Sequence, residues 1–215
     1  MNIIQGSKSN LLKRTSLNFV NQILQKNNNW KILDIGCGYT ANKYASVIAD
    51  EQDLSSFYKG RKFVKINENK LPFKDDEFDF IIASHVIEHV ENFEFFIKEL
   101  ERISKKGYIE LPTRLADNLI FENKNDHIWW FLYDDNSNQL IASKRNQLMD
   151  PFMTVSTGKY FEKIFRESFV LELSWEEKID YKIDNKIKND DFKKISFLKI
   201  IKKYFSKKIR MLLRR

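Results

Sequence analysis

The sequence contains little of what disulfide-bonded, fibrous or membrane-spanning proteins require. Its one cysteine, Cys37, can form neither an internal disulfide nor a cysteine-based zinc site. Six glycines and three prolines exclude a low-complexity linker or a glycine-rich solenoid. The chain has no uninterrupted apolar run of roughly 18 residues, and its first residues lack the charged-then-apolar pattern of a signal peptide. We therefore expect a soluble, cytoplasmic protein with one folded domain.

The composition that remains is suited to a folded core, and its charge is uneven. Hydrophobic residues make up 42% of the 215 residues and aromatic residues 14%, which argues against disorder. The net charge of +7 arises at one end: residues 182–215 hold 13 Lys or Arg and 3 Asp, a net of +10, which leaves −3 for residues 1–181. Because the body is mildly acidic, we expect no nucleic-acid partner.

Short apolar runs alternate with helical patterns along the first half of the chain. The runs predict strands at 30–34, 46–49, 62–66, 78–83 and 108–111, and three- and four-residue spacing predicts helices at 11–25 and 91–104. The second helix is expected to close at Lys105-Lys106-Gly107, with Gly107 as a left-handed cap. Strands that alternate with helices predict an α/β fold with an open, mostly parallel sheet.

The pattern is weaker in the second half. It predicts a β-hairpin from 127–133 and 139–143, a helix at 160–166, and two closing strands at 169–175 and 179–183. The run His127-Ile128-Trp129-Trp130-Phe131 is denser in aromatic rings than a core requires. Two interpretations remain open: the rings stack on a flat or sugar-like ligand, or they clasp the hairpin to the sheet.

A glycine turn follows the first predicted strand, at the edge of the sheet where open α/β folds bind ligands. Gly36 and Gly38 allow a tight turn and let a ligand approach the backbone. The spacing from Gly36 to Ala41 also fits the dinucleotide fingerprint, but Asp34 at the strand tip would face the phosphates. A cofactor with a positively charged amine tolerates that carboxylate better.

Four segments in order resemble the class I S-adenosylmethionine-dependent methyltransferases, and specifically their type 11-like group. They are ILDIGCG at 32–38, LPFKDDEFDFII at 71–82, SHVIEHV at 84–90 and LERISKKG at 100–107. The resemblance implies a Rossmann-like, mostly parallel twisted sheet of about seven strands with helices on both faces, plus the basic C-terminal helix described below. It also implies S-adenosyl-L-methionine as cofactor and a methyltransferase domain over 1–183, with an acceptor-side insertion at about 114–150.

The resemblance further implies a set of cofactor-binding residues. The turn at Gly36 and Gly38 would pass under the methionine part, and Asp34 would help hold its amino group, directly or through water. Asp50 would accept the ribose hydroxyls, with Glu51 and Asp53 as alternatives. The gap from Gly36 to Asp50 is short, so we expect an abbreviated first crossover helix. Asn67 stands where the family usually has the aspartate that contacts the adenine amine, and Ser84 would lie beside the methionine end. The full implied set is Asp34, Gly36, Cys37, Gly38, Asp50, Asn67 and Ser84.

Two histidines are the catalytic candidates. Methyl transfer to a hydroxyl needs a base, and the ordinary histidine pKa of ~6.5 suits that task. His85 and His127 are each expected to act as a general base, to line the acceptor pocket or to be structural, and Glu110 and Thr113 are further pocket candidates. The pattern from His85 to His89 also fits an inverted zinc-protease motif. Because it lies inside the methyltransferase-like run, we expect no metal.

The C-terminal tail, residues 184–215, is predicted to contain a basic amphipathic helix. Residues 193–215 include ten Lys or Arg and no acidic residue. Helical spacing gathers the apolar residues on one stripe and most basic residues opposite, as in interfacial helices. Three interpretations remain: the helix binds an anionic membrane surface, docks on a partner, or packs on its own domain. We favour the membrane, at the inner face. The apolar stripe is Leu198, Ile201, Phe205, Ile209 and Leu212.

The expected function is methyl transfer from S-adenosylmethionine to a small-molecule or glycan acceptor, at oxygen. The strand Gly107-Tyr108-Ile109-Glu110-Leu111-Pro112 and the following histidine–tryptophan segment resemble methyltransferases of cell-surface polysaccharide biosynthesis. A membrane-binding tail would suit a lipid-linked saccharide. The alternative is a non-catalytic scaffold of the same fold that binds a partner or membrane through the basic helix, and a nicotinamide oxidoreductase is a third hypothesis. The acceptor identity and the oligomeric state stay open.

Overall fold

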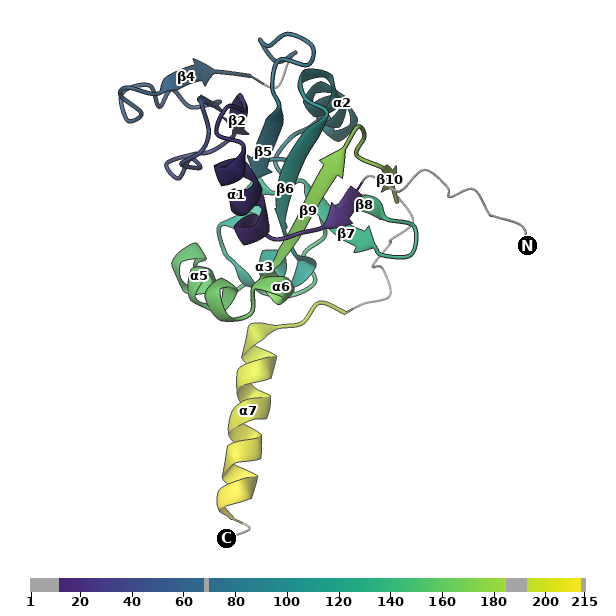
Figure 1. Ribbon diagram of the computed structural model, residues 1–215. Coiled ribbons are helices and arrows are strands. Elements are labelled where there is room, and N and C mark those ends of the chain that lie inside the picture. Colours follow the sequence, from purple (N-terminus) through teal and green to yellow (C-terminus); the bar gives the residue numbers. More distant parts are fainter. Residues whose placement is uncertain (1–11, 68–69, 185–192, 214–215) are drawn as a thin grey trace, which may run out of the picture.

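The computed structural model describes residues 12–67, 70–184 and 193–213. Its centre is a seven-stranded sheet in the order β1-β9-β6-β5-β2-β3-β4 (Figure 1). β9 runs antiparallel to both of its neighbours, and the other pairings in this sheet are parallel. The prediction of a mostly parallel, Rossmann-like sheet of about seven strands is confirmed. The strands are β1 (Leu12–Arg14), β2 (Ile32–Ile35), β3 (Val47–Asp50), β4 (Lys62–Lys65), β5 (Phe80–Ser84), β6 (Lys106–Pro112) and β9 (Val170–Glu176).

Helices cover both faces of this sheet, because alternate residues of its buried strands point to opposite sides. On one face, Val20 and Leu24 of α1 (Leu17–Lys26) pack on Ile32, Phe80 and Tyr108. On the other face, α2 (Phe93–Ile103) packs its apolar stripe on the main core. The remaining helices are α3 (Arg114–Leu119), α4 (Asn123–Asp126), α5 (Val155–Ile164), α6 (Arg166–Phe169) and α7 (Phe197–Leu212).

A smaller sheet lies on the same face as α2. It contains β10 (Tyr181–Ile183), β8 (Gln139–Lys144) and β7 (Trp129–Asp134), and the antiparallel β7–β8 pair confirms the predicted hairpin. Trp129, Trp130 and Phe131 are only 6%, 2% and 2% exposed. These rings hold the hairpin to the core, so the stacking interpretation is wrong. The strand predicted at 179–183 joins this sheet rather than closing the large one.

The segment predicted as a helix at 11–25 contains a short strand followed by a helix. Leu12–Arg14 is an edge strand, with Leu12 paired to Trp175 and completely buried. The hydroxyl of Ser16 then accepts a hydrogen bond from the backbone N–H of Phe19 and caps α1. The predicted helix therefore starts six residues later than expected; Leu11 lies outside the described residues.

Gly107 does not cap a helix. α2 ends at Ile103, its C-cap Ser104 is already extended, and Gly107 lies inside β6. A Cβ atom at Gly107 would approach the Trp175 ring to 1.9 Å. The glycine is therefore needed for space under an indole ring that β9 places opposite it.

The connection from β2 to β3 contains turns and no helix, which confirms the expected abbreviated crossover. Side chains replace the helix as support. Arg61 donates to the carbonyls of Asn42 and Ala45, at 2.8 and 2.7 Å. The Tyr58 hydroxyl donates to the Gly38 carbonyl and accepts from the Ala41 N–H. Tyr58 and Arg61 thus fix this loop from one side, and its other side is left accessible to a ligand.

α7 extends away from the body, from the end of the molecule where α3, α5 and α6 lie (Figure 1). Among the described residues, the contacts that anchor it lie at its base: Phe197 stacks on Phe152 at 5.0 Å, and Lys194 pairs with Asp150 at 2.8 Å. No residue of α7 is buried. This arrangement contradicts the interpretation that the helix packs on its own domain. Among the described helices, none combines the length and the apolar character needed to cross a membrane.

Candidate functional site

A cleft of about 410 Å³ opens at the carboxyl ends of β2 and β5. These strands are neighbours where the strand order reverses, which is where open α/β sheets bind ligands. The cleft thus lies at the edge that the sequence singled out. Its lining residues are Gly36, Gly38, Tyr39, Asp50, Glu51, Gln52, Ile66, Asn67, His85, Val86, His89, Val90 and Phe96.

The glycine turn forms one wall of this cleft. Gly36 and Gly38 have φ angles of +66° and +50°, a region that favours glycine. A Cβ at Gly36 would lie 2.4 Å from a methyl carbon of Val86. The Gly36 N–H donates to the Ala49 carbonyl at 2.7 Å, so the turn is tied to β3. Backbone geometry and packing therefore both require glycine at position 36.

Asp50, at the end of β3, is one of two acidic residues that line the cleft. Its side chain accepts hydrogen bonds from the N–H groups of Gly38 and Gln52, at 2.8 and 2.9 Å. A carboxylate has about four lone-pair sites, so two remain for a ligand. Glu51 and Asn67 also line the cleft, whereas Asp53 does not and accepts from Ser55 instead.

Asp34 and Cys37 point behind the turn and do not line the cleft. Asp34 is 3% exposed and accepts from the Asn42 N–H at 2.6 Å, and burial raises the pKa of its carboxyl to about 7. The Cys37 thiol lies by Tyr58, and burial raises its pKa to about 12. Both side chains support the loop from behind. A cofactor in the cleft would therefore contact the backbone of the loop and not these two side chains.

His85 follows Ser84 at the end of β5, with a strained φ of +55°. Its Nδ1 donates to Glu88 at 3.1 Å, and its Nε2 lies 3.2 Å from Glu110. Burial lowers the pKa of His85, but the hydrogen bonds to Glu110 and Glu88 outweigh it and raise the pKa to about 10. An imidazolium with both nitrogens engaged has no free base, so this geometry does not support that predicted role. Ser84 is half-buried, and neither cavity includes it.

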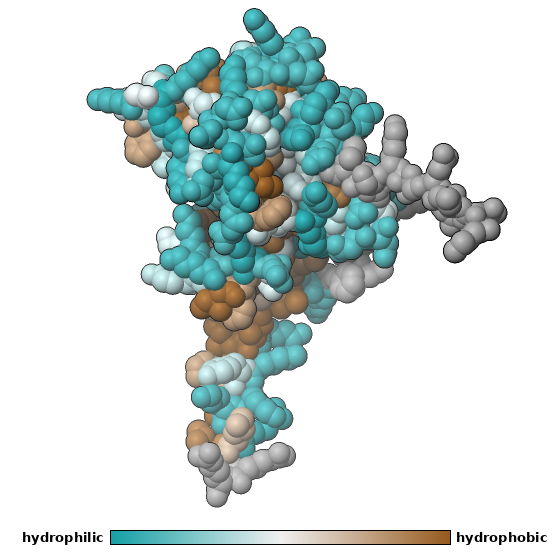
Figure 2. Space-filling view, in the orientation of Figure 1, coloured by the Kyte–Doolittle hydropathy of each residue, from teal (hydrophilic) through white to brown (hydrophobic). Residues whose placement is uncertain are grey.

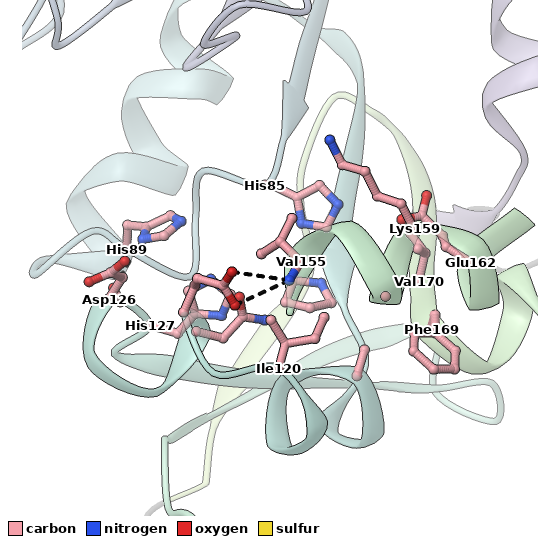
Figure 3. A pocket seen from close by; sticks show the side chains of 15 residues that line it. His85, His89, Ile120, Asp126, His127, Val155, Lys159, Glu162, Phe169 and Val170 are labelled. Atoms are coloured by element: carbon pink, nitrogen blue, oxygen red, sulfur yellow. Dashed lines mark hydrogen bonds between the residues drawn. The ribbon is translucent and has the colours of Figure 1, made fainter. Parts of the chain in front are cut away.

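A second cavity of about 310 Å³ adjoins the cleft, and both are lined by His85 and His89 (Figure 3). Its walls come from α3, the segment around α4, and α5. Glu110 and Thr113 lie outside it: Glu110 binds Tyr108 and Arg166, and Thr113 caps α3. The lining residues are His85, His89, Pro112, Ala116, Ile120, Glu122, Asn123, Asp126, His127, Val155, Gly158, Lys159, Glu162, Phe169 and Val170.

His127 is held in this wall by a buried acid. Its Nδ1 donates to Asp117, which is completely buried and also accepts from Trp130 and Arg145. Burial raises the pKa of Asp117, but the hydrogen bonds and charges of these partners outweigh it, and the net pKa is lowered. With Nδ1 fixed in this way, Nε2 is the ring atom left to contact a ligand.

Sequence reasoning missed Asp117 and Arg145. Arg145 follows Asp117 by 28 residues, and their pairing depends on the β7–β8 hairpin folding back onto α3, which no local pattern reveals. It also missed Tyr39 and Phe96 in the cleft wall. The position of Tyr39, directly after Gly38 in the turn, was a usable signal.

Residues 33–109 match the family model described as a methyltransferase domain. The chain is 28% identical over 131 residues to a ubiquinone biosynthesis O-methyltransferase of Pelagibacter ubique, covering 54% of this chain and 53% of that protein. It is 34% identical over 77 residues to the uncharacterized protein MJ1123 of Methanocaldococcus jannaschii, covering 36% and 34%. The chain therefore spans about half or less of the curated relatives it matches.

Solved structures are similar to a modest degree. An S-adenosylmethionine-dependent methyltransferase from Mesorhizobium loti aligns with a TM-score of 0.43 at 12% identity, over 74% of this chain and 96% of that one. The protein PH0226 from Pyrococcus horikoshii aligns with a TM-score of 0.42 at 16% identity, over 74% and 88%.

Proposed function

We propose that this chain, whose residues 33–109 match a methyltransferase-domain model, binds S-adenosylmethionine and transfers its methyl group to an acceptor bound in the second cavity. The observation that carries the proposal is that the cleft and the cavity meet at His85 and His89. A donor in one and an acceptor in the other would meet where the two cavities share these residues. Positioning alone accelerates such a transfer strongly.

We assign the cleft of about 410 Å³ to the cofactor. The bare backbone at Gly36 and Gly38 lets a ligand approach closely, and Asp50 has lone pairs left for ribose hydroxyls. Asn67 is assigned to the adenine amine. Asp34 and Cys37 would act by shaping the turn, and Ser84 by its position at the end of β5.

We propose oxygen as the methylated atom, on a small molecule or a saccharide. The cavity is small and lined by a histidine whose Nε2 is directed by a buried acid, which suits a hydroxyl. One relative is named as an O-methyltransferase, which supports the same choice. Since the aromatic run is buried, support for a saccharide now rests on the tail and the sequence resemblance.

We also propose that α7 binds an anionic membrane surface, with residues 1–183 as the catalytic domain and 184–215 as the tail. Phe205, Ile209 and Leu212 are 58%, 55% and 70% exposed on one stripe, and the helix contains no acidic residue. Apolar atoms also gather where α7 leaves the body (Figure 2). Each basic residue near such a surface is worth about 1 kcal/mol. A lipid-linked acceptor would then reach the cavity from the membrane.

The test of cofactor binding is calorimetry with S-adenosylhomocysteine on the full chain. Asp50→Asn keeps an acceptor for the Gly38 N–H but removes the charge, so we expect binding weaker by roughly ten- to hundredfold. Asp53→Asn, the same change three residues away and outside the cleft, is the matched control. Equal losses in both variants, or no binding by the unmodified chain, would contradict the proposal. Methyl transfer is then scored against a panel of hydroxyl acceptors.

The membrane proposal is tested by co-sedimentation with vesicles that contain phosphatidylserine. Phe205→Ser with Ile209→Ser removes apolar anchors and is expected to release most of the protein. Vesicles of neutral lipid alone give the control for charge. Unchanged sedimentation of the double variant would refute membrane binding through this stripe. Membrane binding by a chain that does not bind S-adenosylhomocysteine would favour the non-catalytic scaffold over the methyltransferase.

A further inference from the structure

A buried carboxylate oxygen without a partner lies beside two histidines. Glu88 is completely buried; its Oε1 accepts from His85, but Oε2 makes no hydrogen bond to any residue that the structure describes. An unpaired buried carboxylate oxygen is costly and calls for a ligand. Glu88, His89 and His127 each offer one donor atom, and these atoms lie within 4.8 Å of one another.

Each of the two histidines has a hydrogen-bond partner on Nδ1. His89 Nδ1 donates to the Asp126 carbonyl at 3.0 Å, and His127 Nδ1 donates to Asp117. Both rings thus keep Nε2 as the free donor, and partners of this kind on the other nitrogen are the usual outer shell of metal-bound histidine. The two ring centroids are 4.6 Å apart.

Backbone contacts hold the three donors together. The Glu88 carbonyl accepts from the N–H groups of Ile128 and Trp129, at 2.8 and 3.2 Å. These bonds link the turn after β5 to the segment that carries His127. In a tetrahedral site with ligand bonds of about 2.1 Å the donors lie roughly 3.4 Å apart, so the most distant pair of donor atoms would have to approach by at most about 1.4 Å.

We propose that Glu88, His89 and His127 bind a divalent transition-metal ion, with zinc as the best match. Two imidazoles and one carboxylate are a donor set that zinc accepts in three-ligand sites with an open position, whereas calcium and magnesium prefer oxygen alone. His89 and His127 line the second cavity, so the open position faces it. This revises the sequence-based expectation of no metal.

The position of the ion indicates which chemical class of acceptor the cavity would bind. An acceptor with a hydroxyl or carboxylate oxygen would supply the fourth ligand and be held at the wall shared with the cofactor cleft. This part rests on the proposed function, whereas metal binding rests on the three side chains alone. His127 would then act as a ligand, and not as a free base.

The experiment is zinc titration by calorimetry on the full chain, stripped with a chelator and free of any histidine tag. We expect one ion per chain and binding weaker by more than about tenfold in both Glu88→Gln and His89→Ala. His89 is exposed, so its loss should leave the fold intact. Glu122→Gln is the control, because Glu122 lines the same cavity but contributes no donor to the cluster.

Cobalt(II) provides a second readout, since its visible absorption reports nitrogen and oxygen ligands in a low-coordinate site. Absence of zinc binding by the unmodified chain, or equal affinity in all four proteins, would overturn the proposal. S-Adenosylhomocysteine binding, measured on the same samples without metal, separates this result from the proposed function. Loss of cofactor binding alone would refute the enzyme and leave the metal site standing.

Discussion

Asp34→Asn should change how stability depends on pH. The buried Asp34 carboxyl has its pKa raised from 3.8 to about 7 by burial. Between these values the unfolded chain has released this proton and the folded chain has kept it, so folding stability falls as pH rises. Each pH unit is worth ~1.4 kcal/mol, which gives a cost of about 4 kcal/mol once the folded carboxyl is also ionised. The cost is absent well below pH 3.8 and complete above about pH 7.

An asparagine at position 34 keeps an oxygen for the Asn42 N–H and carries no charge at any of these pH values. The difference in unfolding free energy, variant minus unmodified protein, should therefore grow by about 2.5 kcal/mol between pH 5 and pH 8. Taking the difference cancels the titration of other groups. The measurement is urea unfolding followed by tryptophan fluorescence at half-unit pH steps.

Asp76→Asn supplies the control, because Asp76 has a φ of +50° that asparagine tolerates and a side chain that is 62% exposed. A flat curve for Asp34→Asn would refute the reasoning, since the ionised carboxylate would then cost the folded state nothing. Repeating the series with saturating S-adenosylhomocysteine asks whether Asp34 pairs with the amine: such a pair would reduce the growth of the difference.

Three further predictions concern the glycines. Gly36→Ala should weaken S-adenosylhomocysteine binding more than tenfold by calorimetry, because both the φ of +66° and the contact with Val86 oppose a side chain; tight binding would count against the turn geometry. Gly107→Ala should lower unfolding stability by about 1–3 kcal/mol in urea, since its Cβ meets Trp175, and Trp175→Phe should restore part of the loss. Gly158→Ala, whose Cβ would lie 2.8 Å from the tip of Ile120, should raise the acceptor KM and leave S-adenosylhomocysteine affinity unchanged; the opposite pattern would exclude this cavity as the acceptor site.

The sheet could be predicted because its strands are continuous apolar runs, which are readable locally. Gly36 and Gly38 were found for the same reason, because they stand two positions apart in the turn that follows a strand. Leu12–Arg14 was not predicted as a strand, because three residues give no period and the pairing partner is about 160 residues away. Gly107 was misassigned because the sequence shows a glycine after a helix but not the Trp175 ring above it.

The side-chain directions were harder to predict than the positions. Asp34 and Cys37 lie where the resemblance implies, yet their side chains point behind the turn toward Asn42 and Tyr58. The period of β2 ends at Ile35, so the sequence cannot say which way the side chain of Cys37 turns in the loop. The same limit hid Asp117, whose partners come from β7 and from the segment after β8.

The three histidines of the chain all line the second cavity, and each has its Nδ1 fixed by a different group. Glu88 holds His85, the Asp126 carbonyl holds His89, and Asp117 holds His127. A core does not need such control, because an apolar residue fills space without a buried acid as partner. The cost of burying polar partners to orient these rings is explained if the ring surfaces that line the cavity bind a ligand. Because the cofactor cleft, the cavity and the Glu88 cluster are tested by different variants, a failure at one of them identifies which part of the assignment is wrong.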